Sequence, residues 1–187
     1  NTMNKTEWHS FGYKYTREVE AWAQREMYLK FELKSITLDW SARRSRSRGG
    51  MYADGPGISI AMSPACRDQK GELYKIYEYA SFAKDPDIGE IYTRRKTAKL
   101  EMVILHEVAH ALQYYSYKLN NYRCKPHGPV FKNMYRRLRC AFLNPLLENQ
   151  AEAREEYEKI VKGIESGNFK VITDNEISQI LKRAASS

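Results

Sequence analysis

Three of the four histidines in this 187-residue chain have a spacing that suits a metal ion. His106 and His110 are four residues apart, so on a helix they lie one turn apart on the same face and can hold one ion together. Glu107 stands beside them, where it could take a proton from water at that ion. His127 opens a His-Gly-Pro-Val-Phe stretch and could return to the site as a third ligand. Three protein ligands leave one tetrahedral position free, which is typical of a catalytic rather than a structural zinc site.

Other interpretations of this pattern stay open at the level of sequence. A His-Glu-x-x-His run also arises by chance, and its histidines can be satisfied core residues; a third histidine before a helix-starting Gly-Pro argues against that alternative. Glu148 or Glu152 could supply the third ligand, as in thermolysin-like enzymes, but both lie in what reads as an exposed charged helix. His127 is the better candidate because neutral imidazole suits zinc. The metzincin pattern is excluded, since it requires Gly at 113 and His at 116 and the chain has Gln113 and Ser116.

The elements upstream of this motif are predicted from apolar periodicity. Helical spacing indicates a helix in residues 15–34, with Thr16 as its N-cap. Residues 36–40 and 58–62 alternate between apolar and polar side chains, which predicts two antiparallel strands joined by an exposed basic loop. Residues 67–92 are polar and turn-rich, and we interpret them as an irregular insertion.

The helix that carries the motif is expected to be buried. Residues 93–119 contain no Gly or Pro and are apolar on nearly every side, which gives a metal site low-dielectric surroundings. A second helix is predicted over 129–143 and a charged one over 150–163. A short strand at 169–172 and a last helix from residue 173 complete the prediction. The inner stripe of the second helix is formed by Phe131, Met134, Tyr135, Leu138 and Phe142.

Composition limits the setting in which the protein works. No apolar run approaches the ~20 residues that span a bilayer, and no charged-then-apolar segment opens the chain, so we expect no membrane or secretory role. The three cysteines are an odd number without a Cys-x-x-Cys pair, which indicates a reducing compartment: cytoplasm, nucleoid or nucleus. A monomer is expected.

The net charge of +8 is unevenly distributed. Residues 1–145 hold 25 Lys and Arg against 15 Asp and Glu, whereas residues 146–187 hold 6 against 8. A basic body predicts a polyanionic partner, most simply nucleic acid, although such charge also serves solubility alone. Trp40 could stack on a base, or belong to the core. The candidate nucleic-acid contacts are Arg43, Arg44, Arg46 and Arg48 in the basic loop and Lys132, Arg136 and Arg139 on the outward face of the second helix.

The run HEVAHALQYYSY, followed by HGPVF and the basic helix FKNMYRRLR, resembles the SprT-like metalloprotease family, which includes the Spartan proteases. The upstream stretch WSARRSRSRGGMYADGPGISIAMSP is similar to that family as well, so the resemblance covers roughly residues 33–144. It implies a zincin-type α+β domain with His106, His110 and His127 as zinc ligands and Glu107 as general base. It also implies activity on proteins bound or crosslinked to DNA, as in DNA–protein crosslink repair, with DNA as activator. The chain departs from many members by lacking a cysteine zinc ribbon and ending in a helix-rich, slightly acidic segment, which leaves open how DNA is held.

The sequence therefore predicts an α+β, zincin-like domain over 1–145 with a small antiparallel sheet and a buried His-Glu-x-x-His helix, and a helix-rich extension over 146–187. The predicted function is a Zn²⁺-dependent endopeptidase acting on DNA-associated proteins, with single-stranded or damaged DNA as partner. The alternatives are a zinc protease independent of nucleic acid and a non-catalytic DNA-binding adaptor that keeps zinc for stability. A peptide could lie along the edge of strand 58–62. The oxyanion donor is left open among Tyr114, Tyr115, Tyr117 and Tyr122.

Overall fold

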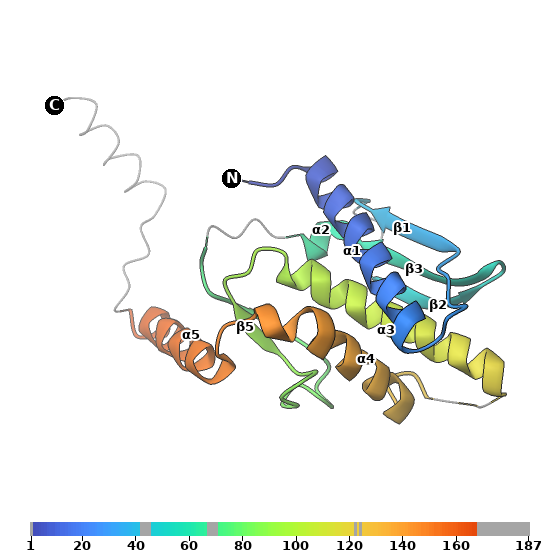
Figure 1. The fold of residues 1–187 in the computed structure, drawn as a ribbon. Coiled ribbons are helices and arrows are strands. Elements are labelled where there is room, and N and C mark those ends of the chain that lie inside the picture. The colour runs from blue at the N-terminus through green and yellow to red at the C-terminus, as the bar shows by residue number, and fades with distance from the viewer. Residues whose placement is uncertain (1, 42–45, 67–70, 122, 124, 168–187) are drawn as a thin grey trace.

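The computed structural model describes residues 2–41, 46–66, 71–121, 123 and 125–167. Helices and two small sheets alternate along the chain, so the predicted mixed α+β class is confirmed in this general form. Figure 1 shows the central helix α3 lying between the larger sheet and helix α4. The elements are α1 (Lys5–Glu26), β1 (Ser35–Asp39), β2 (Arg48–Tyr52), β3 (Gly55–Ala61), α2 (Met62–Ala65), β4 (Tyr74–Ile76), β5 (Ile91–Thr93), α3 (Ala98–Asn120), α4 (Pro129–Phe142), the 3-10 turn η1 (Asn144–Leu146) and α5 (Gln150–Glu165).

The larger sheet has the strand order β1-β3-β2. β1 runs parallel to β3, and β2 runs antiparallel to it, so the predicted antiparallel pairing of strands 36–40 and 58–62 is wrong. The prediction failed because the true antiparallel partner, β2, has the sequence RGGMY, whose two glycines read as a turn rather than a strand. β4 and most of β5 lie in segment 67–92, which was predicted to be irregular, because strands of three residues give no periodic signal. β5 ends at Thr93, and α3 begins at Ala98 rather than near residue 93.

Helix α1 covers Lys5–Glu26, so it begins and ends earlier than the helix predicted over residues 15–34. Asn4 caps it and Glu7 reaches back to the Asn4 amide, which forms a capping box. Thr16 is therefore not an N-cap; it is buried in the middle of the helix, where its hydroxyl donates to the carbonyl oxygen of Gly12 at 2.7 Å. Such a bond back to the preceding turn satisfies a buried hydroxyl inside a helix.

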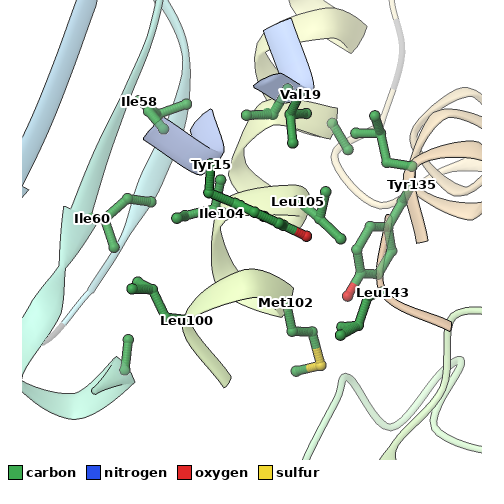
Figure 2. Packing of buried hydrophobic residues seen from close by; sticks show 14 of the residues in the cluster. Tyr15, Val19, Ile58, Ile60, Leu100, Met102, Ile104, Leu105, Tyr135 and Leu143 are labelled. Carbon is green, nitrogen blue, oxygen red and sulfur yellow. The ribbon is translucent and has the colours of Figure 1, made fainter. Parts of the chain in front are cut away.

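Helix α3 forms the middle of the core, as its sequence predicted. Leu100, Ile104 and Leu105 are fully buried. Figure 2 shows the sheet residue Ile58 on one side of this helix and Tyr135 of α4 on the other. Full burial of each such aliphatic side chain contributes about 1.5–3 kcal/mol, so α3 is a rigid support for any site on its surface.

Helix α4 and the start of α5 follow the predictions closely. The inner stripe of α4 is buried at Phe131, Met134, Tyr135 and Leu138. α5 begins against β5, where the Gln150 side chain accepts from the Tyr92 amide and donates to the Tyr92 carbonyl. No helix among the described residues is long and apolar enough to cross a membrane. The predicted strand 169–172 and the last helix lie outside the described residues, and the division at residue 145 stays a prediction.

Candidate metal centre

Three imidazole rings meet on one side of α3. The Nε2 atom of His127 lies 3.0 Å from Nε2 of His106 and 2.9 Å from Nε2 of His110. Nitrogen atoms that share a tetrahedral zinc ion at 2.0–2.1 Å stand about 3.3 Å apart, so these three converge closely enough to hold one ion. The structure thus brings together the three histidines that the sequence singled out, and they could bind a metal ion.

Two elements position these rings. His106 and His110 lie one turn apart on α3, whereas His127 lies in the turn before α4, which starts with Pro129. His127 has a φ of 60°, which lies in the left-handed region that residues other than glycine rarely adopt. Such a conformation costs about 1–3 kcal/mol, and strained residues of this kind cluster at functional sites. We attribute it here to the need to turn the ring of His127 back onto α3.

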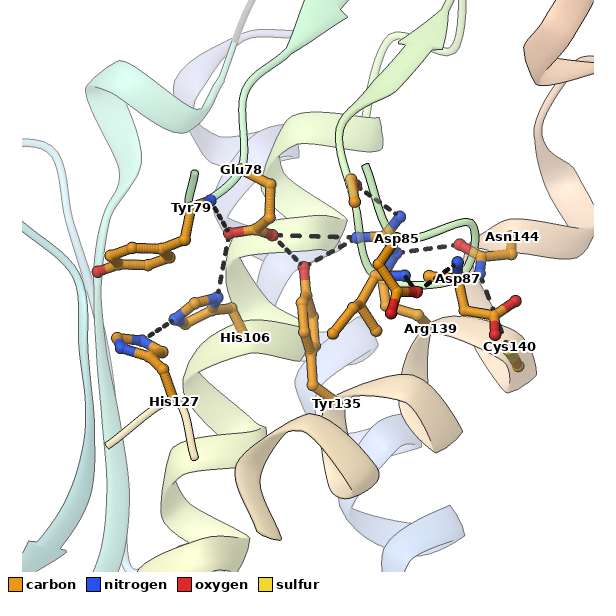
Figure 3. Close-up of polar contacts among 12 residues, drawn as sticks. Glu78, Tyr79, Asp85, Asp87, His106, His127, Tyr135, Arg139, Cys140 and Asn144 are labelled. Carbon is orange, nitrogen blue, oxygen red and sulfur yellow. Dashed lines mark hydrogen bonds and ion pairs between the residues drawn. The ribbon is translucent and has the colours of Figure 1, made fainter. Parts of the chain in front are cut away.

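Two of the ring nitrogens that face away from the cluster, on His106 and His110, also have partners. Nδ1 of His106 lies 3.6 Å from Oε1 of Glu78, as Figure 3 shows. Nδ1 of His110 lies 3.3 Å from Oε1 of Gln113, and the amide of Gln113 donates to the carbonyl oxygen of Lys125 at 2.9 Å. A partner at Nδ1 favours the tautomer whose Nε2 lone pair is free for a metal. Through its hydrogen bond to Lys125, Gln113 also connects α3 to the segment that leads to His127.

Burial sets the charge state of the site. Desolvation lowers the pKa of His106 to about 3 and that of His110 to about 4, and it also lowers the pKa of His127. The imidazoles are therefore neutral at pH 7, the form that binds metals. Burial raises the pKa of Glu107 to about 7, against the opposing hydrogen bond from the Gly49 amide. A carboxyl group with that pKa can both accept and release a proton near neutral pH.

A pocket of about 620 Å³ opens beside His106 and Glu107. One wall is formed by the end of β3 and α2, and another by residues 77–79. The Tyr79 ring lies over the centre, 4.2 Å from the His127 ring and 5.5 Å from the His106 ring between centroids. Glu107, the candidate general base, and His106, one of the candidate ligands, are thus accessible from the same pocket.

The tyrosines considered as oxyanion donors have different surroundings. Tyr114 stacks on His110 with a centroid distance of 6.3 Å, whereas Tyr115 packs edge-on against Phe31. Tyr117 lines a separate pocket with Met51. Tyr122 lies outside the described residues.

Sequence reasoning missed Glu78, Tyr79 and the role of Gln113. Glu78 and Tyr79 lie in the segment read as irregular, so no periodicity marked them, and their approach to the histidines depends on tertiary packing. Gln113 was considered only as a residue that excludes another enzyme class. The glutamate alternative for the third ligand is disfavoured, because Glu148 accepts from the Thr93 hydroxyl at 2.7 Å and from a backbone amide.

The basic residues proposed on α4 do not all face solvent. Arg139 was expected on the outward face, and this is wrong: it is only 2% exposed, because its guanidinium donates to Tyr135, Gly89 and Asn144. Arg136 is half-buried and forms ion pairs with two aspartates. Lys132 is half-buried, with its Nζ 5.7 Å from the Phe82 ring centroid. The carboxylate partners of Arg136 are Asp85 and Asp87.

The basic loop is described only in part. Arg43 and Arg44 lie outside the described residues, whereas Arg46 and Arg48 are exposed. Among the parts of the chain that the structure describes, neither is paired with a carboxylate. Trp40 is half-buried and packs against the core, with the Nζ of Lys5 5.7 Å from its ring centroid.

The sequence was compared with known proteins. The SprT-like family model matches residues 88–155, which include His106, Glu107, His110 and His127. No curated protein and no solved structure matches the chain. Residues 33–87, with β1 to β3, lie outside the match. From residue 88 to residue 155 the chain therefore carries the sequence pattern of the SprT-like family, and the resemblance recognised in its histidine motif is confirmed over that part.

Proposed function

We propose that this protein is a zinc-dependent endopeptidase of zincin type that acts on proteins associated with or crosslinked to DNA. The observation that carries the proposal is the convergence of three Nε2 atoms beside the buried carboxyl group of Glu107, in an open pocket. A zinc site with a purely structural role does not require a carboxyl group beside its ligands. The match to the SprT-like family supports a metalloprotease-related function.

The donor set suits zinc, since His106, His110 and His127 offer three neutral imidazole nitrogens. A zinc ion held by these nitrogens would act as a Lewis acid. It would lower the pKa of water toward about 7 and polarise a carbonyl group. Glu107 accepts the proton of the attacking water and passes it to the nitrogen of the leaving amine. Burial raises its pKa to about 7 in the metal-free protein, and a cation held by the three histidines would lower that pKa, which favours the carboxylate form that accepts the proton.

The substrate would not pair with β3, contrary to the sequence-based hypothesis, because β3 is the central strand of the sheet. Within the described residues β2 pairs only with β3, so its outer edge is the better template for an extended peptide. Pockets lie near both ends of β2. One is lined by Arg46 and Glu107, and the other, of about 480 Å³, by Met51 and Tyr114.

Nucleic acid would approach from the outer face of the sheet. A second pocket of about 360 Å³ there is lined by Arg46, Arg48, Thr37 and Tyr52. Arginine pairs with phosphate, and Tyr52, 41% exposed, offers a ring on which a base can stack. Arg46 also lines the pocket beside Glu107, so a strand bound on this face would hold its attached protein near the metal centre.

The test compares the zinc-loaded protein with Glu107→Gln on a DNA-bound protein substrate. We expect cleavage by the wild type and none by the variant, with zinc binding retained in both. Full activity of the variant would refute the mechanism. Zinc binding without cleavage, with DNA present, would favour the non-catalytic adaptor.

A second experiment addresses the nucleic acid. The double variant Arg46→Glu/Arg48→Glu should weaken binding of single-stranded DNA and flatten its salt dependence. The same charge change at Arg154 and Lys159 on α5 is the matched control, since both are paired within that helix. Equal cleavage of a free protein with and without DNA would favour a protease independent of nucleic acid.

A further inference from the structure

A buried row of polar groups leads from α4 to the metal centre. Arg139 donates to the Tyr135 hydroxyl at 3.0 Å, and that hydroxyl donates to Oε2 of Glu78 at 2.6 Å. The other carboxylate oxygen, Oε1, accepts from the Tyr79 amide at 3.1 Å and lies 3.6 Å from Nδ1 of His106. Figure 3 shows the four side chains in this order. They come from α4, from the segment after β4, and from α3, so the row joins three separate parts of the chain.

The position of Glu78 needs an explanation because it is unfavourable for folding. Its side chain is 4% exposed, and a buried carboxylate is costly unless it is fully paired. Arg139 does not need Glu78 as a hydrogen-bond acceptor, because its guanidinium also donates to the Gly89 carbonyl and the Asn144 side chain. The Nη1 atom of Arg139 lies 4.0 Å from the Glu78 carboxylate. Apolar residues at both positions 78 and 135 would avoid this desolvation penalty without leaving a buried hydroxyl group unpaired. Stability alone therefore does not account for the carboxylate.

The orientation of His106 indicates what Glu78 does. Nε2 of this ring faces the cluster and Nδ1 faces Glu78, so the carboxylate lies behind the ring and is not itself a ligand. A shift of about 0.5 Å would bring the 3.6 Å separation into hydrogen-bond range. A carboxylate in that place holds the imidazole in one tautomer and orientation and increases its basicity.

We propose that Glu78 is a positioning residue that orients His106 for metal binding, and that Tyr135 and Arg139 hold Glu78 in place. The inference rests on the proposed metal site and adds to it a support that the sequence motif does not contain. In this proposal α4 contributes to the site in two ways. It follows His127 in the chain, and its residues Tyr135 and Arg139 hold the carboxylate that contacts His106.

The chain offers a matched control nearby. In the β4–β5 sheet the Tyr92 hydroxyl donates to Glu90 at 2.9 Å, and Lys75 pairs with the same carboxylate at 2.9 Å. This tyrosine–glutamate–cation group has the same chemistry as the proposed support but includes none of the three histidines. Glu90→Gln and Tyr92→Phe therefore report what such a group does for stability alone.

The experiment measures zinc affinity by competition with a chromogenic chelator, and the visible spectrum of the cobalt(II)-substituted protein. Glu78→Gln should bind zinc roughly 10–100-fold more weakly and alter the cobalt bands, because loss of such a partner has that effect on metal sites. Tyr135→Phe should shift both readouts in the same direction by less. Glu90→Gln and Tyr92→Phe should leave both unchanged. If Glu78→Gln does not fold, Tyr135→Phe decides, because it removes only a hydroxyl group.

The inference is overturned if Glu78→Gln shows the zinc affinity and cobalt spectrum of the wild type. The same result in Tyr135→Phe overturns it if Glu78→Gln does not fold. Neither result would affect the proposed protease function. Equal losses of affinity in the control variants would also overturn it, since the effect would then be one of general stability. A wild-type protein that binds zinc but cleaves no protein would refute the proposed function and leave the role of Glu78 intact.

Discussion

Replacing the proposed general base should stabilise the metal-free protein. Burial raises the pKa of Glu107 from 4.5 to about 7, so between these values the folded protein holds a proton that the unfolded chain does not. Stability is therefore lost as pH rises through this window. This difference in pKa corresponds to a loss of roughly 3 kcal/mol of stability above pH 7. Glu107→Gln keeps the size of the side chain and an acceptor for the Gly49 amide but removes the buried charge.

The free energy of unfolding is measured with urea, in the presence of a metal chelator, from pH 5 to pH 8. At pH 8 Glu107→Gln should exceed the wild type by up to about 3 kcal/mol, and the difference should shrink toward pH 5. The buried histidines titrate in both proteins, so their contribution cancels in this comparison. Glu152→Gln is the control, because Glu152 is exposed and should change stability by less than about 0.5 kcal/mol. A variant no more stable than the wild type at pH 8, or a gap that widens toward acid pH, would refute the reasoning.

Three further predictions concern the surroundings of the site. Gly49→Ala should unfold the protein or displace the general base, because a Cβ there would lie 1.9 Å from the carbonyl oxygen of Glu107, whereas Gly50→Ala meets only ordinary contacts at 3.6 Å and should melt near the wild-type temperature. Gln113→Leu should weaken zinc binding, measured by chelator competition, because it removes the hydrogen bond to Lys125 and the partner of a ligand ring; unchanged affinity would contradict this. Zinc should raise the melting temperature in a concentration-dependent way that a chelator reverses, since a ligand bound only by the folded state stabilises it, and a melting temperature indifferent to zinc would count against the metal site.

Much of the candidate metal centre could be predicted because its sequence signal is local. Helix geometry alone places His106 and His110 on one face, and the Gly-Pro after His127 fixes the start of α4. The apolar residues around the motif likewise showed that α3 is buried. These features depend on sequence neighbours, so no knowledge of the fold was needed to find them.

The rest depended on contacts between distant segments. β2 was taken for part of a loop because Gly49 and Gly50 resemble a turn, yet Gly49 is required there by the close approach of the Glu107 backbone. Arg139 was placed on an exposed face, but acceptors from residues 89 and 144 satisfy its guanidinium in the interior. Glu78 could not be found, because its partners lie 28 and 57 residues away. Helical or strand periodicity contains no information about such pairs.

Several features that cost folding free energy lie around the three histidines. His127 adopts a left-handed backbone conformation, while Glu107 and Glu78 place carboxyl groups in the interior, and each of these opposes folding on its own. By contrast, the pKa of Asp85 is lowered, chiefly by its hydrogen bonds with Arg136, and this pairing stabilises the fold. Unfavourable groups that persist together around three converging imidazoles are best explained by a task that needs them, because an apolar core at this position would be more stable. A cation bound between the three rings would offset part of the penalty, so the stability of the fold and the chemistry of the site should depend on the same ion.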